Sequence, residues 1–523
     1  MVLREILAEF FQLPRLAVIL FFATFLVIGQ QVYDDYGISW DEPTQLEIGK
    51  ANYRYLIKGD QSLLEMRDRY YGPLFEIFLV RVMAQAPSRE MYLSRHWWNF
   101  LAFFAGGVGF AFLLERIYPR QWFVLLGCLF LVLTPRIFAD AFYNSKDIPF
   151  LSATIWGMLA LSAYLQKPGL LRVGFVSLAT AAMVGIRLPG IFIAGVTLLL
   201  IGREIIAHRL SFAVGVRDGL VYLILTAGLI FAFYPVLWHD PMGELGRAFE
   251  TMAKFPQYLP VLYLGQFLSP QNLPWHYLPV WVAITVPSAY LGLAIIGGIV
   301  ILWKWVRHPR TLGDDASTPW VLAGLWLFSP WIAVLLFHSA LYDGWRQMFF
   351  LYPAVILFSV RGWEHLYKTV ARINFSPFFQ KGIVGSLLGL IFIPVVVWMV
   401  TFHPYQNVYF NRLAGRDMQT VKMRFDLDYW GLAYREGLES LLKLDGRERI
   451  KVYADTPAGV RNAAILVTSE EHRLDFVNEP GEADYFIGNY RWHPADYPYH
   501  DEVITIWVGN AKILSVFRLT PVH

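Results

Sequence analysis

Long apolar runs are the feature of this sequence that most restricts its fold. A helix that crosses a bilayer needs about 20 mostly apolar residues, and about eleven stretches of the chain approach that length. They lie at 14–32, 97–115, 121–138, 148–165, 170–186, 189–206, 218–237, 278–303, 319–338, 346–362 and 383–402. The sequence therefore predicts a polytopic α-helical membrane domain of about eleven transmembrane helices over residues 1–402. The fifth and sixth runs, separated by Arg187-Leu188-Pro189-Gly190, form either two helices or one broken helix.

Composition supports this class and excludes others. Hydrophobic residues make up 56% of the chain and charged residues only 16%, whereas soluble domains have about 25% charged residues. A net charge of +3 gives no reason to expect a nucleic-acid partner. The single cysteine, Cys128, excludes an intramolecular disulfide and a cysteine-based zinc cluster. The first run lacks a small-residue cleavage pattern, so we expect an uncleaved helix and not a signal peptide.

The distribution of lysine and arginine predicts the orientation, because short cytoplasmic loops carry an excess of both. With a cytoplasmic N-terminus, the inner segments carry Arg4, Arg15, Arg116, Arg120, Lys167, Arg172, Arg203, Arg209, Arg217, Lys304, Arg307, Arg310, Arg361, Lys368, Arg372 and Lys381. The short outer loops carry only Arg136, Lys146, Arg187, Arg247, Lys254 and Arg346. An odd helix count then places residues 33–96 and 403–523 outside, and we expect a bacterial inner (plasma) membrane location.

The segment 403–523 differs in composition from the rest of the chain. Charges become frequent, and strands are predicted at 450–454, 473–477, 483–489, 503–508 and 512–519, with a helix at 459–467. About 120 residues suffice for a small domain. We therefore predict an extracytoplasmic α/β domain, which either docks the acceptor or closes over the site, or else is a passive cap.

Charged side chains recur at the predicted outer ends of the helices. Asp41-Glu42 precedes Pro43, where acids commonly face the positive end of a helix dipole. Taken singly, the other charged residues are more often interface residues than ligands, but all of them face one outer mouth. They are Arg95, Lys146, Asp147, Arg187, His239, Asp240, His276, Asp343 and Arg346.

One reaction suits such a mouth. A lipid-linked phosphate that carries a sugar has its tail in the bilayer and its phosphate at headgroup level. Arginine and lysine side chains hold a phosphate and stabilise the charge of the leaving group; Arg95, Lys146, Arg187 and Arg346 are the candidates. A carboxylate deprotonates the acceptor hydroxyl, and direct displacement inverts the sugar. The sequence assigns no metal ligands and no cofactor, and a requirement for a divalent cation stays open.

The long first loop with Asp41-Glu42 resembles the GT-C superfamily of membrane glycosyltransferases. Within it, the chain looks like the dolichyl-phosphate-mannose–protein mannosyltransferases and the bacterial aminoarabinose (lipid A) transferases. The resemblance covers residues 14–402 and is strongest over 33–190. It implies that Asp41 is the catalytic base with Glu42 as its partner, that Arg95 binds phosphate, and that Asp147 is the acidic residue of the loop before the fourth helix. Many relatives have Lys-Pro-Pro or His-Pro-Pro where this chain has Tyr71-Gly72-Pro73.

The predicted function is an inverting glycosyltransferase. It would move a sugar from a polyprenyl-phosphate donor to a hydroxyl of a glycan, lipid or protein acceptor at the outer face, among membrane lipids. The alternative is a transporter or flippase of a lipid-linked glycan. That alternative predicts charges deep within several helices and two matching halves, and the sequence shows neither.

Overall fold

The computed structural model describes residues 13–83, 86–253 and 259–519. Arg4 and Lys254, both counted toward the orientation, lie outside these ranges. Within them, eight helices are long and apolar enough to cross a membrane. They contain α2 (Leu13–Val32), α6 (Ser88–Ile117), α9 (Asp147–Gln166), α11 (Phe192–Ile206), α12 (Phe212–Phe233), α15 (Ser288–Arg307), α16 (Thr318–Phe337) and α18 (Pro377–Thr401). The predicted polytopic helical fold is confirmed.

The other three predicted runs differ from simple spans. The run 121–138 is a pair, α7 (Gln121–Val132) and α8 (Pro135–Tyr143), bent by 67°. The run 170–186 is the separate helix α10 (Leu170–Ile186) of 17 residues, so the Arg187–Gly190 segment joins two helices. The run 346–362 begins with a 3-10 turn (Arg346–Leu351) before α17 (Tyr352–Arg372).

Proline accounts for the breaks that the sequence prediction missed. The run 278–303 was predicted as one span, but it divides into α14 (Tyr277–Thr285) and α15 around Pro287. Pro135 opens α8, and Pro353 lies in the first turn of α17. Proline lacks the N–H that continues a helix but is tolerated in a first turn, so each of these runs restarts at or near it.

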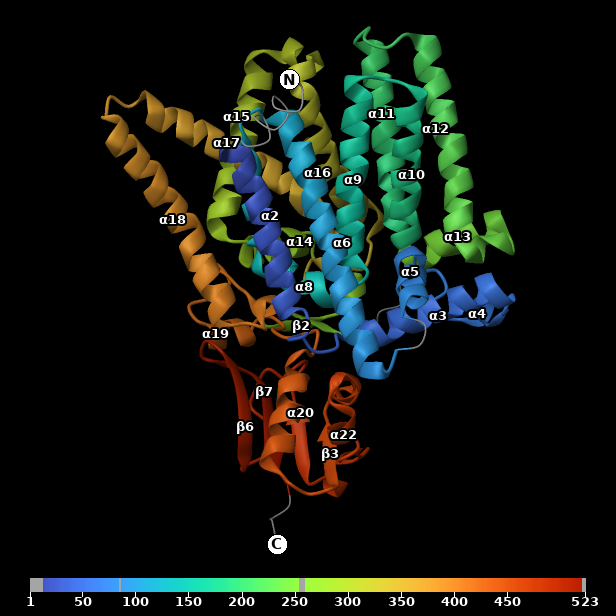
Figure 1. Ribbon diagram of the computed structural model, residues 1–523, viewed down its shortest axis with the longest axis vertical. Helices are drawn as coiled ribbons and strands as arrows, with labels where there is room; N and C mark the ends of the chain where they lie inside the picture. Colours follow the sequence, from blue (N-terminus) through green and yellow to red (C-terminus); the bar gives the residue numbers. More distant parts are fainter. Residues whose placement is uncertain (1–12, 84–85, 254–258, 520–523) are drawn as a thin grey trace, which may run out of the picture.

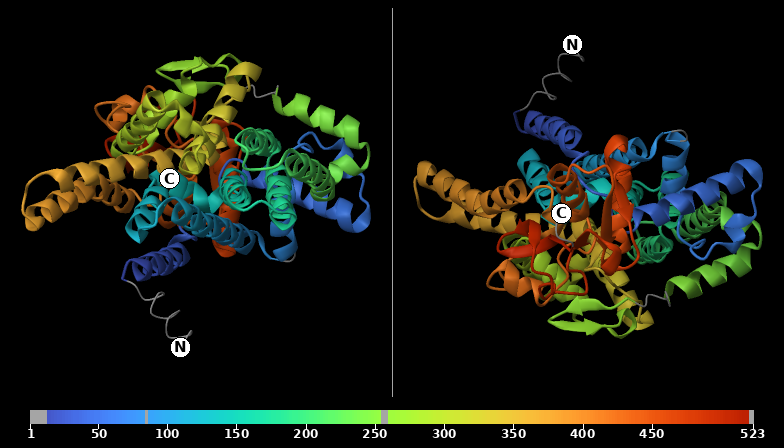
Figure 2. Two further views of the ribbon diagram at one scale, coloured as in Figure 1. Left: turned by 90° about the horizontal axis from the view of Figure 1, so that it is seen from above. Right: turned by 90° about the horizontal axis from the view of Figure 1, so that it is seen from below.

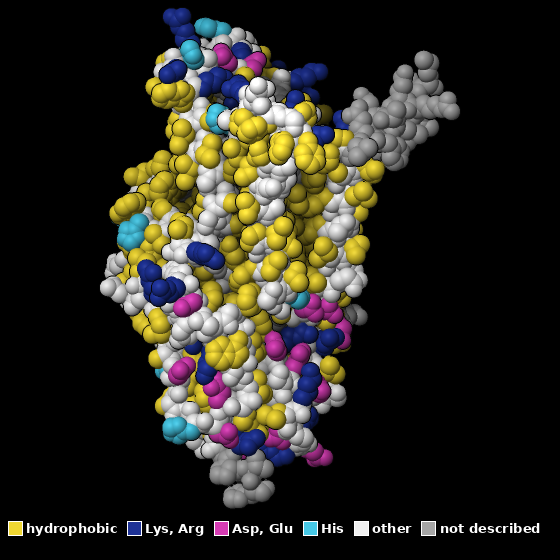
Figure 3. All heavy atoms as spheres, turned by 90° about the vertical axis from the view of Figure 1, so that its left-hand side faces the viewer, with side chains coloured by type: hydrophobic (Ala, Val, Ile, Leu, Met, Phe, Trp, Pro, Cys, Tyr) yellow, Lys and Arg dark blue, Asp and Glu magenta, His cyan; other side chains and the backbone are white. Residues whose placement is uncertain are grey.

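The first loop and the C-terminal domain lie at the same end of the bundle. The loop contains α3 (Glu42–Lys58), α4 (Ser62–Glu65) and α5 (Leu74–Val82). Figure 1 shows these helices and the C-terminal domain at the end opposite to the start of α2, and Figure 2 shows α2 and α18 at the rim. In Figure 3 hydrophobic side chains cover the middle of the molecule, and charged ones gather mainly toward its two ends.

The C-terminal domain (described over 403–519) is a small α/β unit, as predicted. Its helices are α19 (Met418–Lys422), α20 (Ala433–Leu444), α21 (Pro457–Asn462) and α22 (Thr468–Glu471), and its strands are β3 (Ile450–Ala454), β4 (Leu474–Phe476), β5 (Tyr485–Gly488), β6 (Glu502–Val508) and β7 (Ala511–Arg518). The sheet order is β4-β3-β5-β7-β6. β3 pairs in parallel with β4 and β5, whereas β7 pairs antiparallel with β5 and β6.

Two connecting elements complete the end of the bundle that carries this domain. α13 (Pro241–Ala253) follows α12, and a hairpin of β1 (Val261–Tyr263) and β2 (Gln266–Leu268) precedes α14. At the same end of the bundle three aromatic rings stack in a row: Phe100 of α6 on Phe142 of α8 at 5.3 Å, and Phe142 on Tyr36 at 4.7 Å. These buried rings hold Tyr36, at the start of the first loop, against the helices of the bundle.

Candidate active site

The first loop is held in place by the C-terminal domain. A Cβ added to Gly37 would lie 2.5 Å from Oδ1 of Asn462, so only glycine permits this approach. The Asn462 side chain accepts from the Ile38 N–H at 2.9 Å and donates to the Ile38 carbonyl at 3.0 Å. Both backbone groups of Ile38 are thereby fixed three residues before Asp41, which anchors the predicted base.

Asp41 lies at the N-terminus of α3 but makes no capping hydrogen bond. Its Oδ2 instead accepts from Nζ of Lys146 at 3.0 Å and lies 3.2 Å from Nη2 of Arg346. Burial acts to raise the pKa of the Asp41 carboxyl, but Lys146 and Arg346 outweigh it and hold that pKa well below its usual range. The Asp41 side chain is 25% exposed, so one side of the ionised carboxylate is open to solvent.

Two further predicted residues continue this network. Nη1 of Arg346 lies 3.2 Å from Oδ2 of Asp147, the first residue of α9, and Arg187 contacts the other oxygen of Asp147. Burial lowers the pKa of Arg187 to about 10, so its guanidinium stays charged at neutral pH. Lys146, Arg187 and Arg346 are thus joined to one another through the carboxylates of Asp41 and Asp147.

Glu42 and Arg95 lie in a separate buried network. Glu42 accepts from the Ser39 N–H at 2.7 Å and lies 3.2 Å from Nε2 of His96 and 4.0 Å from Nε of Arg95. Arg95 forms a two-pronged ion pair with Glu76, at 2.9 and 3.1 Å. None of the contacts of Glu42 or Arg95 in the described chain is to Asp41, so their catalytic and phosphate-binding roles stay predictions.

The remaining predicted residues fall into two groups. Asp343 joins the network, with its Oδ2 3.4 Å from Nη2 of Arg346. The structure does not bring the other three to the network through any contact in the described residues. Asp240 is exposed and pairs with Arg247 at 3.2 Å, His276 bonds the Tyr263 hydroxyl at 2.7 Å, and His239 is exposed.

A largely apolar cavity of about 380 Å³ ends at this network. Its polar end holds Arg187, Tyr71 and Tyr342; its apolar walls include Leu188, Ile191, Phe192, Ala333, Val334, Phe337 and Phe350. The ring of Tyr71 lies 4.8 Å from Nζ of Lys146 and so links the cavity to the partner of Asp41. A Cβ on Gly72 would collide with the Ile186 carbonyl, so glycine lets this turn of the first loop rest against the end of α10 beside Arg187.

Sequence reasoning missed the aromatic and C-terminal members of the site. The Arg346 guanidinium lies 4.6 Å from the ring of Trp430 and 5.0 Å from that of Tyr342. Nη2 of Arg491 lies 2.8 Å from Oδ1 of Asp343. Trp430 belongs to the unusual segment Asp-Tyr-Trp-Gly at 428–431, a sequence feature that could have marked it as a candidate site residue. Arg491 lies in an irregular loop and has no comparable signal.

The described residues offer no ready site for a metal ion. Over the ranges that the structure describes, no group of three or more histidine, cysteine, aspartate or glutamate side chains is placed to hold a metal ion. The carboxylates of the network are each engaged by lysine or arginine. The arrangement of these residues is that of an anion-binding site beside a carboxylate.

Comparisons with known proteins return structural likenesses. No protein-family model matches the sequence, and no curated protein matches it. Among solved structures, the chain is similar to ArnT from Cupriavidus metallidurans bound to undecaprenyl phosphate, with 14% identity, a TM-score of 0.45, and coverage of 95% of this chain and 97% of that one. The apo form of ArnT gives 13% identity and a TM-score of 0.44 over the same shares of both chains. Both matches cover nearly the whole length of this chain and of ArnT, at 13–14% sequence identity.

Proposed function

We propose that this protein is a membrane glycosyltransferase that moves a sugar from a polyprenyl-phosphate donor to a hydroxyl acceptor with inversion. The observation that carries the proposal is a single arrangement at the polar end of an apolar cavity: Lys146 and Arg346 hold an ionised Asp41, and Arg187 pairs with the next carboxylate of the same network. The acceptor is a glycan, lipid or protein, and the reaction takes place at the outer face of a bacterial inner membrane, with the N-terminus in the cytoplasm.

The cavity would bind the isoprenoid tail of the donor, and the cations at its polar end would bind the phosphate. The apolar walls contributed by α11 and α16 suit an isoprenoid tail, because burial there removes apolar surface from water. Arg187, at the polar end, meets the phosphate, and Lys146 lies close by through Tyr71. Charge-assisted hydrogen bonds from both side chains would stabilise the phosphate as it takes on the leaving-group charge.

The chemical step is a direct displacement. The acceptor oxygen forms a bond to the anomeric carbon as the bond from that carbon to the phosphate oxygen breaks, and the phosphate leaves with the electron pair. Asp41 takes the acceptor proton. Because the phosphate leaves already charged, no general acid is needed.

Donor binding would also activate the base. In the structure, Lys146 and Arg346 hold the pKa of Asp41 well below its usual range, although burial acts in the opposite direction, and a carboxylate in that state is a weak base. A phosphate that draws Lys146 away leaves Asp41 with fewer cations, so the pKa of its carboxyl rises. The base would therefore gain strength only when a donor is present.

The test is sugar transfer by the purified protein in nanodiscs, with a panel of labelled undecaprenyl-phosphate sugars and lipid, glycan and peptide acceptors. Asp41→Asn should lower transfer by about 10²–10⁴-fold, the usual contribution of a general base. Asp60→Asn is the matched control, because Asp60 lies in the same loop in an exposed pair with Arg54 at 3.4 Å. Full activity of Asp41→Asn, retention of configuration at the anomeric carbon, or movement of intact lipid-linked glycan without bond cleavage would each contradict the proposal.

A further inference from the structure

One chain of alternating charges joins the C-terminal domain to the site. Nη2 of Arg491 lies 2.8 Å from Oδ1 of Asp343. Oδ2 of Asp343 lies 3.4 Å from Nη2 of Arg346, and the same Nη2 lies 3.2 Å from Asp41. Arg491 and Asp343 are 148 positions apart, and their side chains are only 4% and 7% exposed. The order of charges is therefore Arg491, Asp343, Arg346, Asp41.

The ion pair of Arg491 and Asp343 is built from unusual backbone on both sides. Asp343 has a φ of 55°, and the two neighbours of Arg491, Tyr490 and Trp492, have φ values of 62° and 61°. Side chains other than glycine rarely adopt this region, and they persist there where surrounding contacts over-determine the conformation. Three such residues lie in or beside one ion pair. We take this to mean that both segments are held in a strained backbone conformation so that Arg491 and Asp343 can meet.

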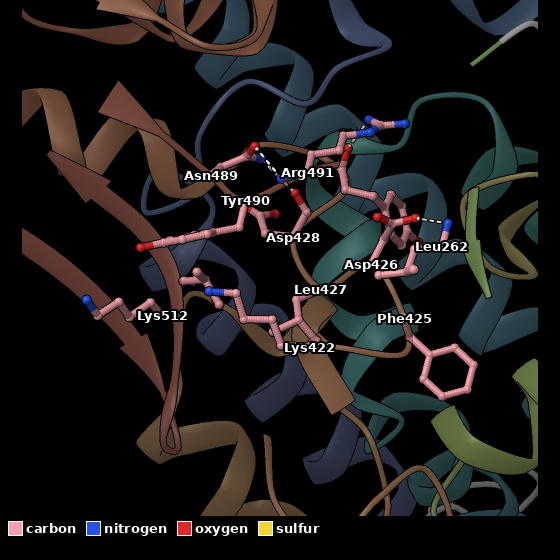
Figure 4. A pocket seen from close by; sticks show the side chains of 12 residues that line it. Leu262, Lys422, Phe425, Asp426, Leu427, Asp428, Asn489, Tyr490, Arg491 and Lys512 are labelled. Carbon is pink, nitrogen blue, oxygen red and sulfur yellow. Dashed lines mark hydrogen bonds between the residues drawn. The ribbon is translucent and has the colours of Figure 1, made fainter. Parts of the chain in front are cut away.

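Further contacts fix the direction of the Arg491 side chain. Its Nη1 donates to the Tyr429 carbonyl. Its guanidinium lies 4.8 Å from the ring of Trp40, the residue before Asp41, and 4.6 Å from the ring of Trp492. Figure 4 shows Arg491 beside Asn489 and Tyr490, with its side chain directed away from the strands of the C-terminal sheet.

We propose that Arg491 is a positioning residue for the transfer reaction, acting through Asp343 to hold Arg346 against Asp41. The inference rests on the proposed function and deepens it, since it makes the C-terminal domain a part of the transferase site and not a passive cap. Asp343 has two oxygens and two cationic partners in the described structure. While Arg491 binds one oxygen of Asp343, the other oxygen contacts Arg346 only weakly, at 3.4 Å, and Arg346 stays close to Asp41. Without Arg491, Asp343 would draw the Arg346 guanidinium toward itself and away from Asp41.

The experiment compares R491Q, R491K, D343N and the double variant R491Q/D343N as full-length protein in nanodiscs. R447Q is the matched control, an arginine of the same domain that is 50% exposed and pairs with Asp445 at 2.7 Å. The measurements are kcat and KM for the undecaprenyl-phosphate sugar donor, together with thermal unfolding.

We expect R491Q to lower kcat/KM by about a hundredfold, the loss that follows a small misplacement of catalytic groups, with the loss in kcat and little change in donor KM. R491K should recover part of it, because lysine keeps the charge but not the fork of donors. The double variant should lose no more than the worse single variant, since residues that act through one another are not additive.

Two results would overturn the inference while the proposed function stands. One is R491Q indistinguishable from R447Q in kcat; the other is a double variant whose loss is the product of the two single losses. If R491Q fails to fold, R491K and D343N are compared with R447Q by the same measurements. If the wild-type protein transfers no sugar, the proposed function fails, and the inference fails with it.

Discussion

Replacing Lys146 by glutamine tests whether this lysine serves the donor. Lys146 is 5% exposed, donates to Asp41 at 3.0 Å and lies over the Tyr71 ring at the end of the cavity. A hydrogen bond to a charged group contributes about 1.5–3 kcal/mol. If Lys146 exchanges its bond to Asp41 for one to the donor phosphate, Lys146→Gln lowers donor affinity by the difference between the two bonds, at most this amount, which is up to about a hundredfold in KM. Asp41 retains Arg346, so kcat should change less.

The assay is initial-rate transfer from a labelled undecaprenyl-phosphate sugar, with donor affinity measured separately because KM equals the dissociation constant only when chemistry is slow. Lys50→Gln is the control, since Lys50 lies in the same loop in an exposed pair with Glu47 at 2.8 Å, and such pairs contribute at most about 1 kcal/mol. A donor affinity of Lys146→Gln equal to that of Lys50→Gln would refute the assignment of Lys146 to the phosphate.

Three further outcomes are expected. Glu42→Gln should lower the unfolding temperature more than Asp41→Asn does, because Glu42 is 1% exposed with fixed partners; equal shifts would contradict this. Ala333→Trp should raise the KM for an undecaprenyl donor more than for a donor of two isoprene units, since Ala333 lines the apolar wall of the cavity. Burial raises the pKa of Asp426 to about 6, so its contribution to stability is present at low pH and lost as pH rises from about 4 to 6. Asp426→Asn should therefore unfold at a higher temperature than the wild type above pH 6, and this advantage should vanish near pH 4 in a pH series of melting curves.

Much of the fold follows from local sequence, but helix continuity does not. Eight of the predicted runs each overlap a long apolar helix, because hydrophobic length is itself the physical requirement for spanning. The breaks near Pro135, Pro287 and Pro353 were missed because proline is accepted inside some apolar helices. Pro330 and Pro394 lie within α16 and α18 without ending them. Whether a proline breaks a helix depends on packing that a single chain does not show.

The candidate site was predictable where charge and helix ends coincide. Lys146, Asp147 and Arg187 lie at the ends of predicted helices on one side, so their place in one network with Asp41 follows from topology. The division between Asp41 and Glu42 does not, because adjacent residues at a helix start point in different directions that depend on neighbours such as Arg95. The role of Arg491 could not be predicted from the sequence, since its loop is irregular and its partner Asp343 is distant in sequence.

The pattern of ion pairs also indicates which cations are able to change partners. Burying a charged group is costly unless it is paired. A phosphate that binds here must therefore displace a carboxylate from its cation, which is easiest at a cation with only one carboxylate partner. Arg346 contacts Asp41, Asp147 and Asp343 and is the anchor of the network. Over the described ranges, Lys146 has one carboxylate partner within ion-pair distance and Arg187 has one, and both lie at the cavity end near Tyr71. The phosphate should therefore bind between Lys146 and Arg187 while Arg346 keeps Asp41 in place, which is why the Lys146 variant is expected to change KM and the Arg491 variant kcat.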